Sequence, residues 1–280
     1  MNEEKIYARR WLILAICCMS LLIVSLDNTI VNVALPSIRI ELHASVSGLQ
    51  WIISAYTLVL ASLLLLSGSL ADRLGRRRVF QLGLILFTVG SLLCSVAPSL
   101  DWLIAFRMVQ AVGGSMLNPV AMSIIVNTFS DRKERARAIG FWGAVVGVSL
   151  ALGPVVGGIL TTTAGWRSIF WVNVPIGIAA IVLAGVFVPE SRAEHARRFD
   201  PAAQVLIILT LGSVVYAIIE GPRLGWGSAV DIGLFLLAAL ALIALLLVER
   251  RRREPLLDLR FFRSLPFSGA LVIALSLIHI

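Results

Sequence analysis

The segment that decides the fold lies between two long apolar runs and reads Gly68-Ser69-Leu70-Ala71-Asp72-Arg73-Leu74-Gly75-Arg76-Arg77-Arg78. Gly68 lets two helix backbones approach closely, and Gly75 supplies a turn residue without a Cβ penalty. Asp72 lies among cationic side chains near helix ends, where a charge-assisted contact would hold this face of the protein in one conformation. The alternative is an ordinary basic loop that contains one aspartate.

The rest of the chain is too apolar for a soluble domain. Of its 280 residues, 59% are hydrophobic and 14% are charged, whereas soluble chains have about 45–50% apolar and about 25% charged residues. The same apolar content excludes disorder. A bilayer core of about 30 Å needs roughly 20 apolar helical residues. Runs of that kind lie at about 11–35, 48–70, 79–98, 102–126, 138–160, 167–188, 202–219 and 228–248.

These runs predict an all-α fold, a polytopic transmembrane helix bundle. A ninth apolar run extends from Leu265 to Ile280 and is short for a crossing at about 1.5 Å per residue. Of the 24 Lys and Arg residues, 20 fall in the N-terminal segment and in every second connection, three fall in the other connections, and Arg107 lies within a span. The positive-inside rule then predicts a cytoplasmic N-terminus.

The distribution of charge and of tryptophan also bears on partners. Since the formal charge of +8 is spread over separate loops, nucleic acid is not an expected partner, and the lipid bilayer is. Tryptophan near span ends is typical of membrane interfaces. We expect that placement for Trp11, Trp51, Trp102, Trp166 and Trp226.

Two ionisable side chains, Asp27 and Arg107, are placed well inside the first six predicted spans. Charge is costly in lipid, so such residues face a bundle interior and mark a pathway or a pair. Counting from the helix ends puts Asp27 about 10–12 Å and Arg107 about 7–8 Å below the same outer surface. We expect the two at similar depth, with a water-filled cavity between them for proton exchange. A change in their separation would alter how readily the carboxylate takes up a proton; a structural ion pair is the alternative.

Glycine and proline are concentrated in the fifth predicted span, at Gly153, Pro154, Gly157 and Gly158. Small residues permit tight helix packing, and proline offers a bend at which a helix pivots; passive packing is the alternative. Two roles are open for the other polar residues in the spans, which are lining a cavity and forming interhelical hydrogen bonds. The cavity candidates are Asn28, Thr29, Asn32, Gln110 and Asn118.

No motif for catalysis or cofactor binding is found in the sequence. A phosphate-binding glycine loop ending in Lys-Ser/Thr is absent, which excludes an ATP motor in this chain, and no Ser/His/Asp or Cys/His set predicts a nucleophile. The three cysteines lie in apolar runs and are expected to pack as small apolar residues. The three histidines are isolated, so no metal site is expected. A proton gradient, without a cofactor, is the expected energy source.

Four motifs resemble those of one transporter family. The segment 68–78 is similar to the loop between the second and third helices of the major facilitator superfamily, Gly-x-x-x-Asp-Arg-x-Gly-Arg-Arg. Leu26-Asp27-Asn28-Thr29-Ile30-Val31-Asn32-Val33-Ala34-Leu35-Pro36 resembles the first-helix motif of its fourteen-span drug:proton antiporters. Arg107-Met108-Val109-Gln110-Ala111-Val112-Gly113-Gly114 is similar to Arg-x-x-Gln-Gly-x-Gly, with Ala111 in place of a glycine. Ser149-Leu150-Ala151-Leu152-Gly153-Pro154-Val155-Val156-Gly157-Gly158 is similar to the exporter motif Gly-x-x-x-Gly-Pro-x-x-Gly-Gly, with Ser149 in place of its first glycine.

The resemblance covers residues 11 to 265 and implies roles for the residues of these motifs. It implies proton coupling at Asp27 and Arg107 and export, rather than uptake, through the fifth helix. Trp166–Pro175 resembles the start of the family's sixth helix, where interfacial anchoring is expected. A conformational gate is implied for the loop residues Gly68, Asp72, Arg73, Gly75, Arg76 and Arg77.

The resemblance also implies an organisation and a function. Residues 1–10 form a cytoplasmic N-terminus, 11–188 a six-helix transporter half of two inverted repeats, 189–265 a linker with a two-helix hairpin and a basic loop, and 266–280 the start of a second half. We expect the N-terminal part of a longer exporter that does not transport alone. The implied function is proton-coupled export of amphipathic or cationic drug-like compounds across the cell inner membrane, and some family members join a periplasmic adaptor protein. The alternatives are an uptake transporter for a small metabolite and a non-transporting membrane fragment.

Overall fold

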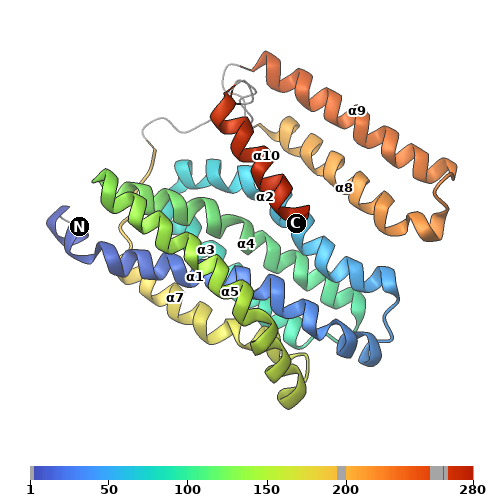
Figure 1. Cartoon of the computed structure of the whole chain (residues 1–280), viewed down its shortest axis with the longest axis horizontal. Helices are drawn as coiled ribbons and strands as arrows, with labels where there is room; N and C mark the ends of the chain where they lie inside the picture. Colours follow the sequence, from blue (N-terminus) through green and yellow to red (C-terminus); the bar gives the residue numbers. More distant parts are fainter. Residues whose placement is uncertain (1–2, 194–199, 253–260, 262–263, 280) are drawn as a thin grey trace.

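The computed structural model describes residues 3–193, 200–252, 261 and 264–279, whose regular structure is helical (Figure 1). The helices are α1 (Glu3–Glu41), α2 (Val46–Leu74), α3 (Arg76–Ser95), α4 (Leu100–Thr128), α5 (Arg132–Ala164), α6 (Ser168–Trp171), α7 (Asn173–Phe187), α8 (Pro201–Leu224), α9 (Ala229–Arg251) and α10 (Leu265–His279). Several of the predicted basic linker positions lie outside the described residues: Arg197, Arg198, Arg253, Arg260 and Arg263.

Eight stretches of the described chain are long and apolar enough to cross a bilayer, which confirms the eight predicted spans. The helices α1 and α5 have 39 and 33 residues and extend beyond their apolar runs. This happens because the hydrogen bonds of an α-helix continue into polar flanks outside the lipid. The sixth span is divided into α6 and α7 at Val172, since Pro175 has no N–H to donate to the carbonyl of Trp171.

Local side chains set where the helices begin. The Ser45 hydroxyl precedes α2 and accepts a hydrogen bond from the N–H of Gly48 at 3.1 Å. The Asp131 carboxylate precedes α5 and accepts from the N–H groups of Lys133 and Glu134, both at 2.9 Å. Such oxygens satisfy N–H groups that have no partner within the helix. The caps therefore start α2 and α5 at polar positions outside the apolar runs.

Six long helices form the main body of the molecule: α1, α2, α3, α4, α5 and α7. In this body α1 packs on α4, α5 and α7, while α4 also packs on α2 and α3. The helices α8 and α9 form an antiparallel hairpin at one edge of the body, and α8 packs on α2 (Figure 1). The main body thus has α1 and α4 at its centre, and these are the helices that carry Asp27 and Arg107.

Two polar contacts and one pair of aromatic rings join the hairpin to α2. Gln204 of α8 donates to the backbone carbonyl of Ser62 at 2.7 Å. Trp51 of α2 donates its indole N–H to Glu220 Oε1 at 2.9 Å, and the rings of Trp51 and Tyr216 lie 5.7 Å apart. Because the two polar contacts lie near opposite ends of α8, they fix the helix along its length.

The two ends of the bundle carry different ion pairs. At the basic end, where α1 and α5 begin, Arg10 pairs with Glu134 at 3.0 Å. At the opposite end, Arg167 pairs with Glu41, and Trp166 donates to Glu41 at 2.8 Å. Trp166 is only 2% exposed. Its indole ring therefore packs into this end of the bundle and its N–H binds the half-exposed Glu41 carboxylate, while the expected place at a membrane interface stays a prediction.

Candidate functional site

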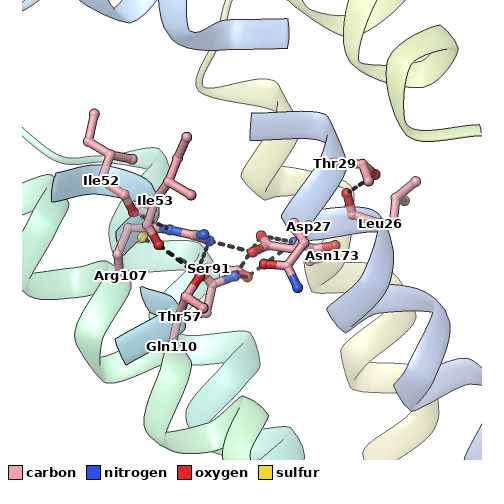
Figure 2. A network of polar contacts seen from close by, with 12 residues as sticks. Leu26, Asp27, Thr29, Ile52, Ile53, Thr57, Ser91, Arg107, Gln110 and Asn173 are labelled. Carbon is pink, nitrogen blue, oxygen red and sulfur yellow. Dashed lines mark hydrogen bonds and ion pairs between the residues drawn. The ribbon is translucent and has the colours of Figure 1, made fainter. Parts of the chain in front are cut away.

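Asp27 of α1 and Arg107 of α4 form an ion pair inside the main body (Figure 2). Their side chains are 0% and 1% exposed. The structure therefore agrees with the prediction that the two residues lie at one depth. The expected water-filled cavity between them is wrong, since the carboxylate and the guanidinium are in direct contact. Removing either partner of such a buried pair would leave an uncompensated charge.

Gln110 lies one helical turn after Arg107 and connects both members of the pair. Arg107 Nη1 donates to Gln110 Oε1 at 2.7 Å, and Gln110 Nε2 donates to Asp27 Oδ1 at 2.9 Å. The same Nε2 atom lies 2.7 Å from Ser91 Oγ of α3. Of the two roles considered for Gln110, the interhelical hydrogen bond is the one that the structure shows. Ser91 is a site residue that the sequence did not indicate.

Asn173 at the start of α7 also binds the Asp27 carboxylate. Its Nδ2 atom donates to Asp27 Oδ1 at 3.0 Å and lies 3.4 Å from Ser91 Oγ (Figure 2). The sequence predicts interfacial anchoring for the segment that contains Asn173, but this side chain is buried in the network. The signal that marks it is an amide in the first turn of an otherwise apolar span, which needs a partner in lipid.

The guanidinium of Arg107 is also held by groups on α2 and α6. Its Cζ atom lies 4.0 Å from the ring centroid of Tyr56 and 5.9 Å from that of Phe170. Its Nε atom donates to the carbonyl of Ile52 at 3.4 Å. A cation above an aromatic face gains most where water is excluded. Arg107 is thus fixed from several sides, and Asp27 is its anionic partner.

The exporter motif on α5 packs against α1 next to Asp27. A Cβ atom at Gly153 would lie 2.6 Å from Thr29 Cβ, and one at Gly157 would lie 2.8 Å from Ile30 Cγ1. Only glycine permits so close an approach of the two helices. Gly158 has nothing within 4 Å of such an atom, and Pro154 is exposed. The motif therefore divides into a packing side and an open side.

The remaining cavity candidates lie on α1 and α4. Asn28 and Asn32 share an exposed face of α1, where Asn32 Nδ2 donates to the carbonyl of Asn28 at 3.0 Å. Thr29 is half-buried and faces α5. Asn118 of α4 is half-buried, and its side-chain oxygen has no hydrogen-bond partner among the described residues. A role of these residues in lining a substrate cavity stays a prediction.

The loop between α2 and α3 turns at Gly75, whose φ of +109° favours glycine. Asp72 Oδ1 lies 3.0 Å from Arg76 Nη2, which agrees with the expected contact between the carboxylate and a neighbouring cation. A Cβ atom at Gly68 would lie in ordinary van der Waals contact, 4.0 Å from Pro119 Cβ, so the packing of α2 on α4 does not require glycine at this position. Gly68 instead lines a pocket of about 290 Å³ between α2 and α4, together with Asp72 and Pro119.

Glu190, beyond the end of α7, holds this loop in place. Its Oε1 atom accepts from the N–H of Arg77 at 3.2 Å and from that of Ser191 at 3.1 Å. A Cβ atom at Gly75 would lie 2.7 Å from Glu190 Cδ. The carboxylate therefore caps the start of α3, where Gly75 offers no side chain for that purpose. The sequence did not indicate Glu190, because 113 residues separate it from Arg77.

The fold and the site together define a class of protein. Membrane-spanning helices enclose a carboxylate whose partners come from α4 and α7, and Ser91 of α3 binds two of those partners. Buried ionisable groups of this kind mark polytopic membrane transporters. The chain belongs to the Major Facilitator Superfamily, whose family model matches residues 17–279.

Two named relatives illustrate this membership. The chain is 40% identical over 253 residues to the multidrug resistance protein Stp of Mycobacterium tuberculosis. This alignment covers 90% of this chain and 47% of that protein. It is 38% identical over 266 residues to the tetracenomycin C resistance and export protein of Streptomyces glaucescens, covering 95% and 49%. The chain spans about half the length of these relatives.

A solved structure supports the fold. The peptide transporter POT in complex with sulfate has a TM-score of 0.64 and 16% sequence identity, with 90% of this chain and 57% of that chain covered. At this identity the likeness extends to the fold alone.

Proposed function

We propose that this chain works in the proton-coupled export of amphipathic or cationic drug-like compounds by alternating access. The observation that carries the proposal is the fully buried Asp27 carboxylate in contact with Arg107, Gln110 and Asn173. The names of the relatives support export, since they describe resistance and export proteins. They do not favour the alternative of an uptake transporter for a small metabolite.

The amides around Asp27 suit a carboxyl group that gains and loses a proton. As a carboxylate, Asp27 accepts from Asn173 Nδ2 and Gln110 Nε2. After protonation it has one hydrogen bond to donate, and an amide that turns by about 180° presents an oxygen in place of its NH2 group. Asn173 Oδ1 has no partner among the described residues, so it is free to accept that bond. Arg107 stays charged in both states.

The proton gradient would then drive a change of conformation. Neutralising Asp27 weakens its attraction to the guanidinium of Arg107, and a separation of the two would let α1 and α4 move apart. The packing of Gly153 and Gly157 on α1 would carry this movement to α5. In this proposal the movement starts when the negative charge of Asp27, the anionic member of the pair, is neutralised.

The proposal includes an orientation and a location. A multi-pass protein with bacterial relatives belongs in a cell membrane. We place the basic end on the cytoplasmic side, with the N-terminus there, because that end carries most of the arginines. The finer assignment to an inner membrane, and a periplasmic adaptor protein as partner, come from the resemblance of the sequence.

The experiment that tests the proposal uses the intact gene product in vesicles with an imposed proton gradient. Efflux of a fluorescent cationic dye is compared for the unchanged protein, Asp27→Asn and the control Asp101→Asn. Asp101 is an exposed acid at the start of the same helix as Arg107, so its change removes an equal charge away from the site. We expect Asp27→Asn to abolish gradient-driven efflux while inserting normally, and Asp101→Asn to retain it. Normal proton-driven efflux by Asp27→Asn would contradict the proposal.

A further inference from the structure

A second site lies at the basic end of the bundle, outside the charge network. It is a pocket of about 270 Å³ between the last turn of α2, the first turns of α3 and the segment after α7. Its lining combines cationic and apolar side chains: Arg73, Leu74, Arg78, Val79, Leu82 and Arg192.

The arginines of the loop divide between the interior and this pocket. Arg76 turns inward, where its side chain is 11% exposed and pairs with Asp72. Arg78 lines the pocket with a side chain that is 65% exposed, 3.6 Å from Glu190. Arg73 and Arg192 are exposed, and among the described residues neither has an ion-pair partner. Of the two described acids nearby, Asp72 is paired with Arg76, so Glu190 alone faces the three arginines of the pocket and a surplus of positive charge remains.

The floor of the pocket is apolar and continues along the surface of α3. Leu74 and Leu82 are exposed beside the arginines. Ile85 and Val89 follow Leu82 at helical spacing and are also exposed, so these residues share one face of α3. An apolar strip therefore leads from the cationic pocket toward the middle of the membrane.

We propose that this pocket binds the headgroup of an anionic phospholipid, with Arg73, Arg78 and Arg192 on the phosphate and the α3 strip against an acyl chain. Basic pockets between membrane helices are suited to such headgroups, and the surplus charge favours a lipid with two phosphates, such as cardiolipin. A free phosphate ion would use the arginines but not the leucines. The inference requires only that the chain spans a membrane, so it is independent of the proposed export function.

Native mass spectrometry of the full chain, titrated with cardiolipin or phosphatidylcholine in a mild detergent, tests the proposal. The variant Arg73→Gln/Arg192→Gln is compared with the control Arg250→Gln/Arg251→Gln, which removes two exposed arginines from the end of α9 at the same end of the bundle. We expect the unchanged chain to bind cardiolipin in preference to phosphatidylcholine. The pocket variant should bind it about 30-fold more weakly, the factor that two surface arginines contribute, and the control should change less than about threefold.

Additional measurements show whether the ligand is a lipid or a free phosphate ion, and whether a loss of binding comes from misfolding of the variant. Arg73→Lys/Arg192→Lys keeps the charge and should keep most of the binding, and the single change Arg192→Gln outside the helices serves if the double variant elutes as misfolded protein. Inorganic phosphate at millimolar concentration should not displace cardiolipin. Displacement by phosphate, equal binding of phosphatidylcholine, or an equal loss in the Arg250/Arg251 control would each overturn the proposal.

Discussion

The packing of α5 on α1 leads to a prediction about one added methyl group. In Gly153→Ala the new Cβ atom would lie 2.6 Å from Thr29 Cβ. Rotation of the Thr29 side chain moves its hydroxyl but leaves Cβ in place, so the two helices must move apart. Overpacking of this kind costs about 1–3 kcal/mol, and about 1 kcal/mol returns because alanine is a better helix former than glycine.

Gly158→Ala is the matched control on the same helix. Nothing lies within 4 Å of a Cβ atom at this position, so only the propensity gain of about 1 kcal/mol remains. We therefore expect Gly153→Ala to be less stable than Gly158→Ala by about 1–3 kcal/mol.

The assay is unfolding of the purified chain in mixed micelles by titration with sodium dodecyl sulfate, followed by circular dichroism. A relief variant, Thr29→Gly in the Gly153→Ala background, removes the opposing Cβ atom and should recover part of the lost stability. Equal stability of Gly153→Ala and Gly158→Ala, or no effect of the relief variant, would refute the reasoning that Gly153 sets the distance between α1 and α5.

Three further predictions use the same unfolding assay or hydrogen exchange. Asp27→Asn and Arg107→Gln should each destabilise the chain by about 3–5 kcal/mol, and the double variant should lose less than the sum, because no charge is then left unpaired; strict additivity would contradict the ion pair. Glu190→Gln should lose about 1 kcal/mol and speed amide exchange at the start of α3, since the carboxylate caps that helix; unchanged exchange there would argue against the cap. Trp51→Phe removes the indole N–H that binds Glu220, and it should speed exchange in α8 but not in α3; equal effects on both helices would indicate general loosening instead.

The membrane spans were predictable because the physical requirement is local. Lipid demands about 20 apolar residues in a helix, and each of the eight spans satisfies this within its own stretch of sequence. Helix ends were less predictable, since hydrogen bonding within a helix does not stop where the apolar residues stop. Arg132 begins α5 six residues before the predicted span because Asp131 caps it there.

The charged pair was also predictable, and for a similar reason. A charged side chain such as Asp27 or Arg107 is costly in lipid. Each lies a known number of residues from the end of its own helix at the same membrane surface, so the rise per residue predicts that the two lie at a similar depth. What lies between them did not follow from the count. Direct contact, in place of water, depends on how closely α1 and α4 approach, and that is a property of the packed bundle.

The sequence alone determined that this chain spans a membrane and that one carboxylate and one guanidinium lie deep inside its first six spans, since the cost of a charge in lipid depends on residue type and depth. Only the tertiary structure decided which partners they have. Asn173 reaches Asp27 from α7 across 146 residues of chain. Ser91 of α3 joins the network through Gln110 and Asn173, and Glu190 reaches the loop at Gly75 across a similarly long stretch of chain. A linear sequence shows that a helix has a polar residue but not which way that residue faces, and the direction is set by the neighbours against which the helix packs.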